Sequence, residues 1–169
     1  MYRKAFFAIC LNGFALAFTW GITVTNIPWL FDRVGIKETD LGIWFTIFAI
    51  LQLIFSQLSG RVIVPLIGTT KTLMLGQLSF AIFPYIFITA SNIQTFFLSS
   101  IPLSIAAGLI FPTIASSTNF IENKTKRIYQ TYQQASFSFG FIISGIFASL
   151  FFYLNLYLSL IHISEPTRL

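Results

Sequence analysis

The chain has 169 residues, of which 56% are hydrophobic and 9% are charged. A soluble domain usually carries about 25% charged residues, and a chain of this length lacks the interior to bury so much apolar surface. The composition therefore excludes an ordinary soluble fold and favours a membrane protein. The net charge of +5 is held in short clusters, whereas a nucleic-acid-binding surface needs a continuous basic face. We expect no nucleic-acid partner.

Five long apolar stretches follow one another, separated by short charged segments. A helix crosses a bilayer with about 20 apolar residues, and these stretches lack the alternating polarity of barrel strands. The sequence therefore predicts an all-α fold, a polytopic transmembrane bundle of about five helices. We place the helices at residues 5–31, 41–60, 72–89, 93–119 and 128–153.

The connecting segments also carry information. The uncharged stretch 72–121 is long enough for two spans, and we expect the break at Ala90-Ser91-Asn92, where Asn92 can cap the next helix. The segments 32–40, 61–71 and 122–127 are expected to be connectors.

The distribution of basic residues predicts the orientation. With a cytoplasmic N-terminus, the inner segments carry Arg3, Lys4, Arg61, Lys71, Lys124, Lys126 and Arg127, and the outer loops carry Arg33 and Lys37. The positive-inside rule then predicts a cytoplasmic N-terminus for a multi-pass protein of the inner or plasma membrane.

We interpret the C-terminal residues 158–169 as a segment that does not belong to the natural protein sequence. Residues 158–168 read LSLIHISEPTR and resemble the conceptual translation of a transposase-based sequencing adapter over eleven consecutive positions. We expect the natural sequence to end near Tyr157, residues 158–169 to derive from an adapter, and residues 1–157 to belong to a longer protein. His162 then carries no functional argument.

Motifs of catalysis and metal binding are missing from the sequence. There is no phosphate-cradling glycine loop with lysine, no CxxC, no HExxH and no nucleophile elbow. The single cysteine, Cys10, allows neither a disulfide nor a cysteine metal site. We expect no enzyme, no metal and no cofactor.

Uncharged polar residues do occur inside the predicted spans. Asn12, Thr19, Thr23 and Asn26 share one face of the first helix, with Trp20 beside them. Polar side chains in a span either line a cavity or form interhelical hydrogen bonds that pack the bundle. Both interpretations stay open here, and under the first this face lines a substrate path. Further candidates for such a path are Gln52, Ser104 and Gln133.

A second pattern lies in the fifth predicted helix. Ser136, Gly140, Ser144 and Ala148 recur at a spacing of four. Small residues at this spacing let another helix approach closely. We interpret this face as a helix-packing surface.

The loop after the second predicted helix resembles a known motif. Residues 60–71 resemble a degenerate form of the loop motif of the major facilitator superfamily, which runs glycine, three variable residues, Asp-Arg, one residue, glycine and then basic residues. Gly68 and Lys71 match, Gly60 stands one place displaced beside Arg61, and Pro65 occupies the aspartate position. In the next inner segment, Asn119 and Glu122 are similar to the sugar-permease-like branch of that superfamily.

This resemblance implies a twelve-helix transporter of two six-helix halves with the substrate site between them. The chain would supply part of the first half, a partial major facilitator fold, and would move a small organic solute by alternating access. Its partners would be that solute, the lipid bilayer and the missing C-terminal half, and the two loop segments would act in gating. The alternatives are another polytopic transporter or channel, and a non-transporting five-helix membrane protein.

Overall fold

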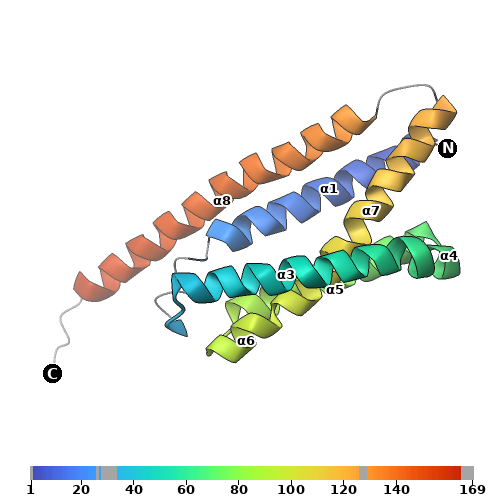
Figure 1. Cartoon of the computed structure of the whole chain (residues 1–169). Coiled ribbons are helices and arrows are strands. Elements are labelled where there is room, and N and C mark those ends of the chain that lie inside the picture. The colour runs from blue at the N-terminus through green and yellow to red at the C-terminus, as the bar shows by residue number, and fades with distance from the viewer. Residues whose placement is uncertain (1, 26, 28–33, 126–128, 165–169) are drawn as a thin grey trace.

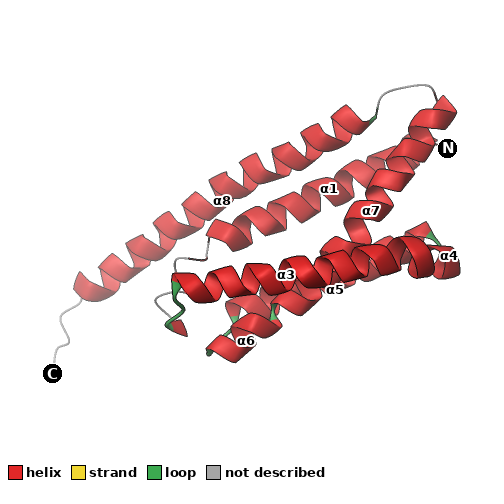
Figure 2. Cartoon of the chain, in the orientation of Figure 1, coloured by secondary structure: helices red, strands yellow, loops and turns green. Residues whose placement is uncertain are grey.

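The computed structural model describes residues 2–25, 27, 34–125 and 129–164, and these contain helices and no strands (Figures 1 and 2). The elements are α1 (Tyr2–Thr25), α3 (Glu38–Leu58), the π-helical turn η1 (Ser59–Ile63), α4 (Val64–Ile67), α5 (Thr69–Ile88), α6 (Ile93–Leu98), α7 (Ser100–Thr125) and α8 (Gln130–Ser164). Four helical stretches are long and apolar enough to cross a membrane: Lys4–Thr25, Glu38–Ile67, Thr69–Ile88 and Ile93–Thr125. The predicted all-α transmembrane bundle is confirmed.

The second span extends beyond both ends of the predicted helix 41–60. It begins at Glu38, where the Asp40 carboxylate accepts a hydrogen bond from the Lys37 backbone N–H at 2.9 Å. Acidic side chains in a first turn are stabilised by the positive end of the helix dipole. These charged residues therefore belong to the helix start rather than to the preceding connector.

At its other end this span remains helical through η1 and α4, so the predicted connector 61–71 is wrong over residues 61–67. Pro65 has no backbone N–H and would interrupt a regular α-helix. The π-helical turn just before it is a known way to absorb such an interruption. The chain turns instead at Gly68, whose φ of 82° is a conformation that glycine adopts without strain.

The other predicted boundaries shift by smaller amounts. α1 begins at Tyr2 rather than at residue 5, and α5 begins at Thr69 rather than at residue 72. The span predicted at 93–119 is divided at Ser99 into α6 and α7, which continues to Thr125. The Asn92 side chain accepts a hydrogen bond from the Thr95 N–H at 2.9 Å and caps α6. α8 starts at Gln130 and its backbone continues past residue 153 to Ser164.

A buried aromatic cluster joins α3, α5 and α6. The ring centroids of Phe83, Phe87 and Phe96 lie 5.7 to 6.4 Å from that of Trp44, which is 1% exposed. The Trp44 indole N–H donates to the Phe96 carbonyl and to the Ser99 hydroxyl, both at 3.1 Å. A buried tryptophan normally finds such a partner, and here the partners mark the junction between α6 and α7.

Glycines allow two pairs of helices to touch through their backbones. A Cβ at Gly108 of α7 would lie 2.5 Å from Phe55 Cβ of α3, and one at Gly140 of α8 would lie 2.5 Å from the Phe14 carbonyl oxygen of α1. Neither position has room for a larger residue. Close approach of this kind is how helices associate where lipid removes the hydrophobic driving force between them.

The helices divide into two packed groups. α8 lies along α1, and α7 packs against both α3 and α5 (Figure 1). The groups meet at Trp20 of α1, whose ring centroid lies 5.9 Å from Phe48 of α3 and 6.2 Å from Phe83 of α5. Phe111 of α7 and Phe137 of α8 also touch, with centroids 6.2 Å apart. This division leaves space between the groups elsewhere.

Replacing Trp44 by phenylalanine should destabilise the bundle by about 1–3 kcal/mol. The change removes the indole N–H that donates to two acceptors, and the smaller ring leaves a cavity in the buried cluster. Denaturant unfolding in detergent micelles measures this loss. The control is Leu53→Ala, because Leu53 belongs to the same helix and is 64% exposed. A loss for Trp44→Phe no larger than for the control would contradict the role given to the cluster.

The two glycines of α8 form a matched pair for testing the α1–α8 contact. Gly140→Ala should destabilise the bundle by about 1–3 kcal/mol through overpacking against the α1 backbone. Gly145→Ala should be neutral or stabilising, since nothing lies within 4 Å of its added Cβ and alanine favours a helix. Thermal unfolding of both variants in detergent tests this order, and equal melting temperatures would refute the packing assignment.

Candidate functional site

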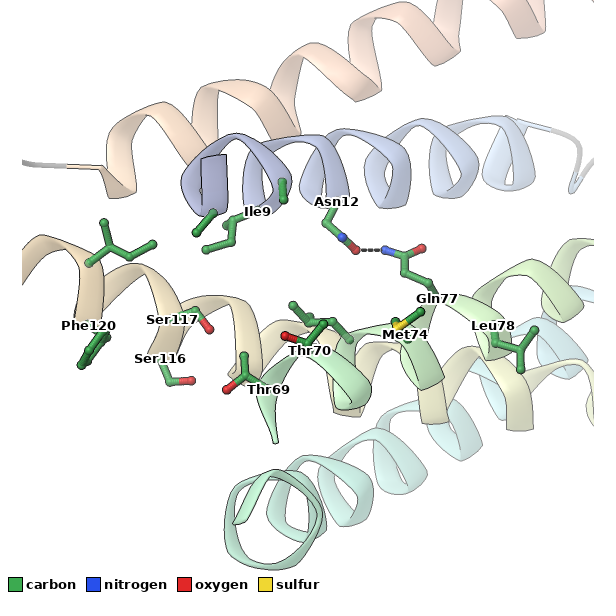
Figure 3. Close-up of a pocket in the computed structure, with 14 residues that line it drawn as sticks. Ile9, Asn12, Thr69, Thr70, Met74, Gln77, Leu78, Ser116, Ser117 and Phe120 are labelled. Carbon is green, nitrogen blue, oxygen red and sulfur yellow. Dashed lines mark hydrogen bonds between the residues drawn. The ribbon is translucent and has the colours of Figure 1, made fainter. Parts of the chain in front are cut away.

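A cavity of about 1080 Å³ lies between the two helix groups. Its walls come from the N-terminal part of α1, the first turns of α5 and the last turns of α7 (Figure 3). The lining residues are Ala5, Ala8, Ile9, Asn12, Thr69, Thr70, Leu73, Met74, Gln77, Leu78, Ser116, Ser117, Phe120 and Ile121. Its volume lies slightly above the range of roughly 300–1,000 Å³ that is typical of small-molecule pockets.

A pair of amides spans this cavity from wall to wall. The Gln77 side-chain N–H of α5 donates to the Asn12 carbonyl oxygen of α1, and both residues line the cavity (Figure 3). Each amide keeps further donor and acceptor capacity beyond this one bond. The pair therefore links the two helix groups and also presents hydrogen-bonding atoms to the cavity.

The rest of the described lining is uncharged. Ser116 and Ser117 of α7 donate their hydroxyls to the Thr113 carbonyl at 3.1 and 2.7 Å, and Thr69 and Thr70 add two hydroxyls from α5. The remaining lining side chains are aliphatic or aromatic, or contain methionine sulfur. This chemistry suits an amphipathic molecule with a few hydrogen-bonding groups rather than an ion.

Among the predicted path residues of α1, only Asn12 lines the cavity in the described part of the chain. The Thr23 hydroxyl donates to the Thr19 carbonyl within the same helix at 2.8 Å, and Thr23 is 5% exposed. Trp20 packs between Phe48 and Phe83, as described above. Asn26 lies outside the described residues.

The candidates from the other helices lie at helix contacts. The Ser104 hydroxyl is fully buried and donates to the Ser100 and Phe48 carbonyls at 2.6 and 3.2 Å. The Gln52 backbone oxygen lies at the close approach of Gly108. Gln133 lies on the α1–α8 contact, where its side-chain nitrogen would be 3.8 Å from a Cβ added at Gly13.

The predicted packing residues of α8 all face inward. The Ser136 hydroxyl donates to the Cys10 carbonyl at 2.7 Å, and Ser144 lies against Gly21, whose added Cβ would overlap the serine side chain. Ser144 and Ala148 are 1% and 4% exposed. Together with Gly140 they give α8 a narrow face along α1.

The predicted gating residues lie at the same end of the bundle as the cavity. Gly60 and Arg61 are exposed in η1, Gly68 forms the turn, and Lys71 is exposed in the first turn of α5. Asn119, with Glu122, belongs to the last turns of α7 rather than to a loop.

Glu122 ties the end of α7 to the start of α8. One of its carboxylate oxygens accepts the backbone N–H groups of Tyr129 and Gln130, both at 2.6 Å. The first N–H groups of a helix have no partner within the helix, and a carboxylate is favoured there by the helix dipole. Glu122 therefore caps α8 from outside it.

The site residues predicted from the sequence do not include Gln77, Thr69 or Thr70, which line the cavity. Gln77 is an isolated amide within an apolar span, which is itself a signal, because polar side chains there seek partners. Gln77 and Asn12 are 65 residues apart in the sequence. The residue pattern of a single helix does not show which residue of another helix will be its partner.

Comparisons with known proteins agree on one family. The sequence model of the Major Facilitator Superfamily matches residues 9–162. The chain is 28% identical to Multidrug resistance protein 1 of Bacillus subtilis over 95% of its own length and 45% of that protein. It is 29% identical to Multidrug resistance protein 2 of the same organism, over 83% of the chain and 36% of that protein.

A third relative, Quinolone resistance protein NorA of Staphylococcus aureus, is 22% identical over 83% of the chain and 36% of that protein. The chain thus spans less than half the length of these curated relatives. No solved structure matches it significantly.

Removing the Glu122 carboxylate should loosen the start of α8. Glu122→Ala should speed hydrogen exchange at the Tyr129 and Gln130 amides by about tenfold, equivalent to roughly 1.4 kcal/mol of a charge-assisted bond. Asn119→Ala, an exposed position on the same helix, should leave exchange unchanged. Unaltered exchange in Glu122→Ala would show that the cap contributes nothing to the order of α8.

Proposed function

Because this chain belongs to the Major Facilitator Superfamily, we propose that it forms part of a transporter that moves a small organic solute across the plasma membrane by alternating access. The chain is a multi-pass membrane protein with several helices long enough to span a bilayer. The main observation in favour of a solute site within this chain is a cavity between the two helix groups whose described lining is uncharged. The Asn12–Gln77 amide pair crosses this cavity.

The amide pair provides a physical basis for coupling the solute to movement. A solute with a hydrogen-bonding group can take over bonds that Asn12 and Gln77 make to each other, since an amide offers both donors and acceptors. A ligand shifts a conformational equilibrium only by binding one state better than the other. Solute bound between α1 and α5 would favour the arrangement with the two groups further apart.

The chemistry of the lining indicates the class of solute. Among the described residues, no charged side chain lines the cavity, so we infer an uncharged or weakly polar molecule with a substantial apolar surface. Sugars and drug-like amphipathic compounds are both small organic solutes that an uncharged site can bind. The relatives are named for resistance to multiple drugs and to quinolones, which favours the drug-like class over the sugar-permease-like branch.

We infer that the remaining parts of the mechanism lie outside this chain. The missing half and its share of the substrate site stay proposals, supported by the greater length of the relatives. For this chain itself, the cytoplasmic position of the N-terminus is a proposal supported by the gathering of basic residues at one end. Residues 158–169 as an adapter-derived segment likewise stay a prediction.

Transport measured in cells tests the role of the amide pair. With the protein as its host expresses it, Asn12→Ala and Gln77→Ala should each slow efflux of the uncharged dye Nile red by about tenfold, roughly 1.4 kcal/mol of lost solute binding. Gln94→Ala, an exposed glutamine of α6, is the matched control. Normal efflux in both test variants at normal membrane abundance would rule out the pair as a solute contact.

A further inference from the structure

Four hydroxyl side chains line one part of the cavity, on the walls formed by α5 and α7. We call them the hydroxyl patch, and they are Thr69, Thr70, Ser116 and Ser117. In Figure 3 these side chains lie to one side of the Asn12–Gln77 bond, where α5 begins. The cavity therefore has polar groups in two places, the amide pair and the hydroxyl patch.

The packing of α5 against α7 places the threonines and the serines at the same level. Gly76 of α5 lies against Ile110 of α7, and the first turns of α5 meet the last turns of α7 at the cavity. The two helices therefore run antiparallel. Thr69 lies seven residues before Gly76, and Ser117 lies seven residues after Ile110, so these two hydroxyl residues face the cavity from neighbouring walls.

The two serine hydroxyls present lone pairs rather than protons to a ligand. A serine has one O–H donor and two acceptor lone pairs. Ser116 and Ser117 both donate their O–H to the Thr113 carbonyl within α7, at 3.1 and 2.7 Å. A ligand group that bonds to these oxygens without breaking the bonds within α7 must therefore be a hydrogen-bond donor.

The amide pair supplies donors that the serines do not. One Gln77 N–H donates to the Asn12 carbonyl oxygen, which leaves the Asn12 amide with both of its N–H donors. An acceptor group of a ligand can bond there. The described lining thus offers donors at the amide pair and acceptors at the hydroxyl patch, with apolar side chains such as Leu73 in the same cavity.

We propose that the hydroxyl patch is the second polar contact of the solute and selects molecules that carry an uncharged hydrogen-bond donor, such as a hydroxyl or an amide N–H. The proposal rests on the transport function proposed above, and it adds the orientation of the solute. An acceptor group of the solute lies at Asn12, and its donor lies at the oxygens of Ser116 and Ser117. A solute without the donor leaves those oxygens unpaired in the complex, which lowers its affinity.

Two uncharged dyes that differ in one group test this selectivity. Nile red has a carbonyl at one end of its ring system and a diethylamino group at the other. One N-ethyl group is replaced by 2-hydroxyethyl in the donor dye and by 2-methoxyethyl in the capped dye. Scintillation proximity measures binding of the radiolabelled dyes to the purified protein as its host expresses it. The donor dye should bind about fivefold more tightly, which is the effect of one neutral hydrogen bond.

Variants of the serines show whether the patch causes this preference. In the double variant Ser116→Ala/Ser117→Ala the ratio of the two affinities should fall about fivefold from its wild-type value, and each single variant should show part of the loss. Ser116→Thr keeps a hydroxyl and should retain the preference. Ser91→Ala is the matched control, because Ser91 is an exposed serine beyond the other end of α5. A double variant with the wild-type ratio, or an equal loss in Ser91→Ala, would overturn the proposal.

Binding and transport together separate this proposal from the one on which it rests. Asn12→Ala and Gln77→Ala should lower the affinity for both dyes and keep the preference for the donor dye. If cells export neither dye but the purified protein loses its preference with the serines, the transport proposal fails and the hydroxyl patch is supported. If both dyes are exported and the double variant keeps the wild-type ratio, the hydroxyl patch is refuted and the transport proposal stands.

Discussion

The indole N–H of Trp44 is the contact around which one part of this bundle is organised. It donates to a carbonyl of α6 and to the hydroxyl at the α6–α7 junction, while its ring packs on aromatic side chains of α5 and α6. Lipid offers little hydrophobic force between helices, so specific packing and hydrogen bonds determine which helices pair. With α3 held to α5 and α6, α7 can pass close to α3 at Gly108.

The second group rests on a different interaction. α1 and α8 meet along small residues, where Gly140 lies on the α1 backbone and Ser136 donates to the Cys10 carbonyl. The two helices pack closely here, because a small side chain lets the backbone of the neighbouring helix approach. The contacts between the two groups are of another kind: aromatic contacts of Trp20 and of Phe111 with Phe137, and one amide pair. Because these contacts are few, the arrangement of the two groups can change there while the packing within each group stays intact.

The sequence predicted what depends on local composition. Charge-free stretches of about 20 residues identified the membrane spans, and the spans are helical because a segment in lipid must satisfy its own backbone hydrogen bonds. The spacing of Ser136, Gly140 and Ser144 indicated a helix-packing face. The helix through Arg61 to Ile67 was not predictable from charge, because a charged residue ends a membrane span without ending a helix. The role of Ser104 depends on carbonyls of two helices, and the partner of Gln77 depends on the tertiary arrangement. Neither can be read from one helix.

The position of charge relative to the cavity connects these observations. A carboxylate or ammonium inside the lining would be costly to desolvate, and the described lining has neither. Cations are placed instead at the end of the same helices, as at Lys71 of α5 and Lys124 of α7. The same α7 therefore presents neutral hydroxyls at Ser116 and Ser117, an aromatic ring at Phe120 and an ammonium at Lys124 in successive turns. This order keeps the charge of α7 at the end of the helix and leaves only uncharged groups along the cavity, where a charge would be costly to desolvate.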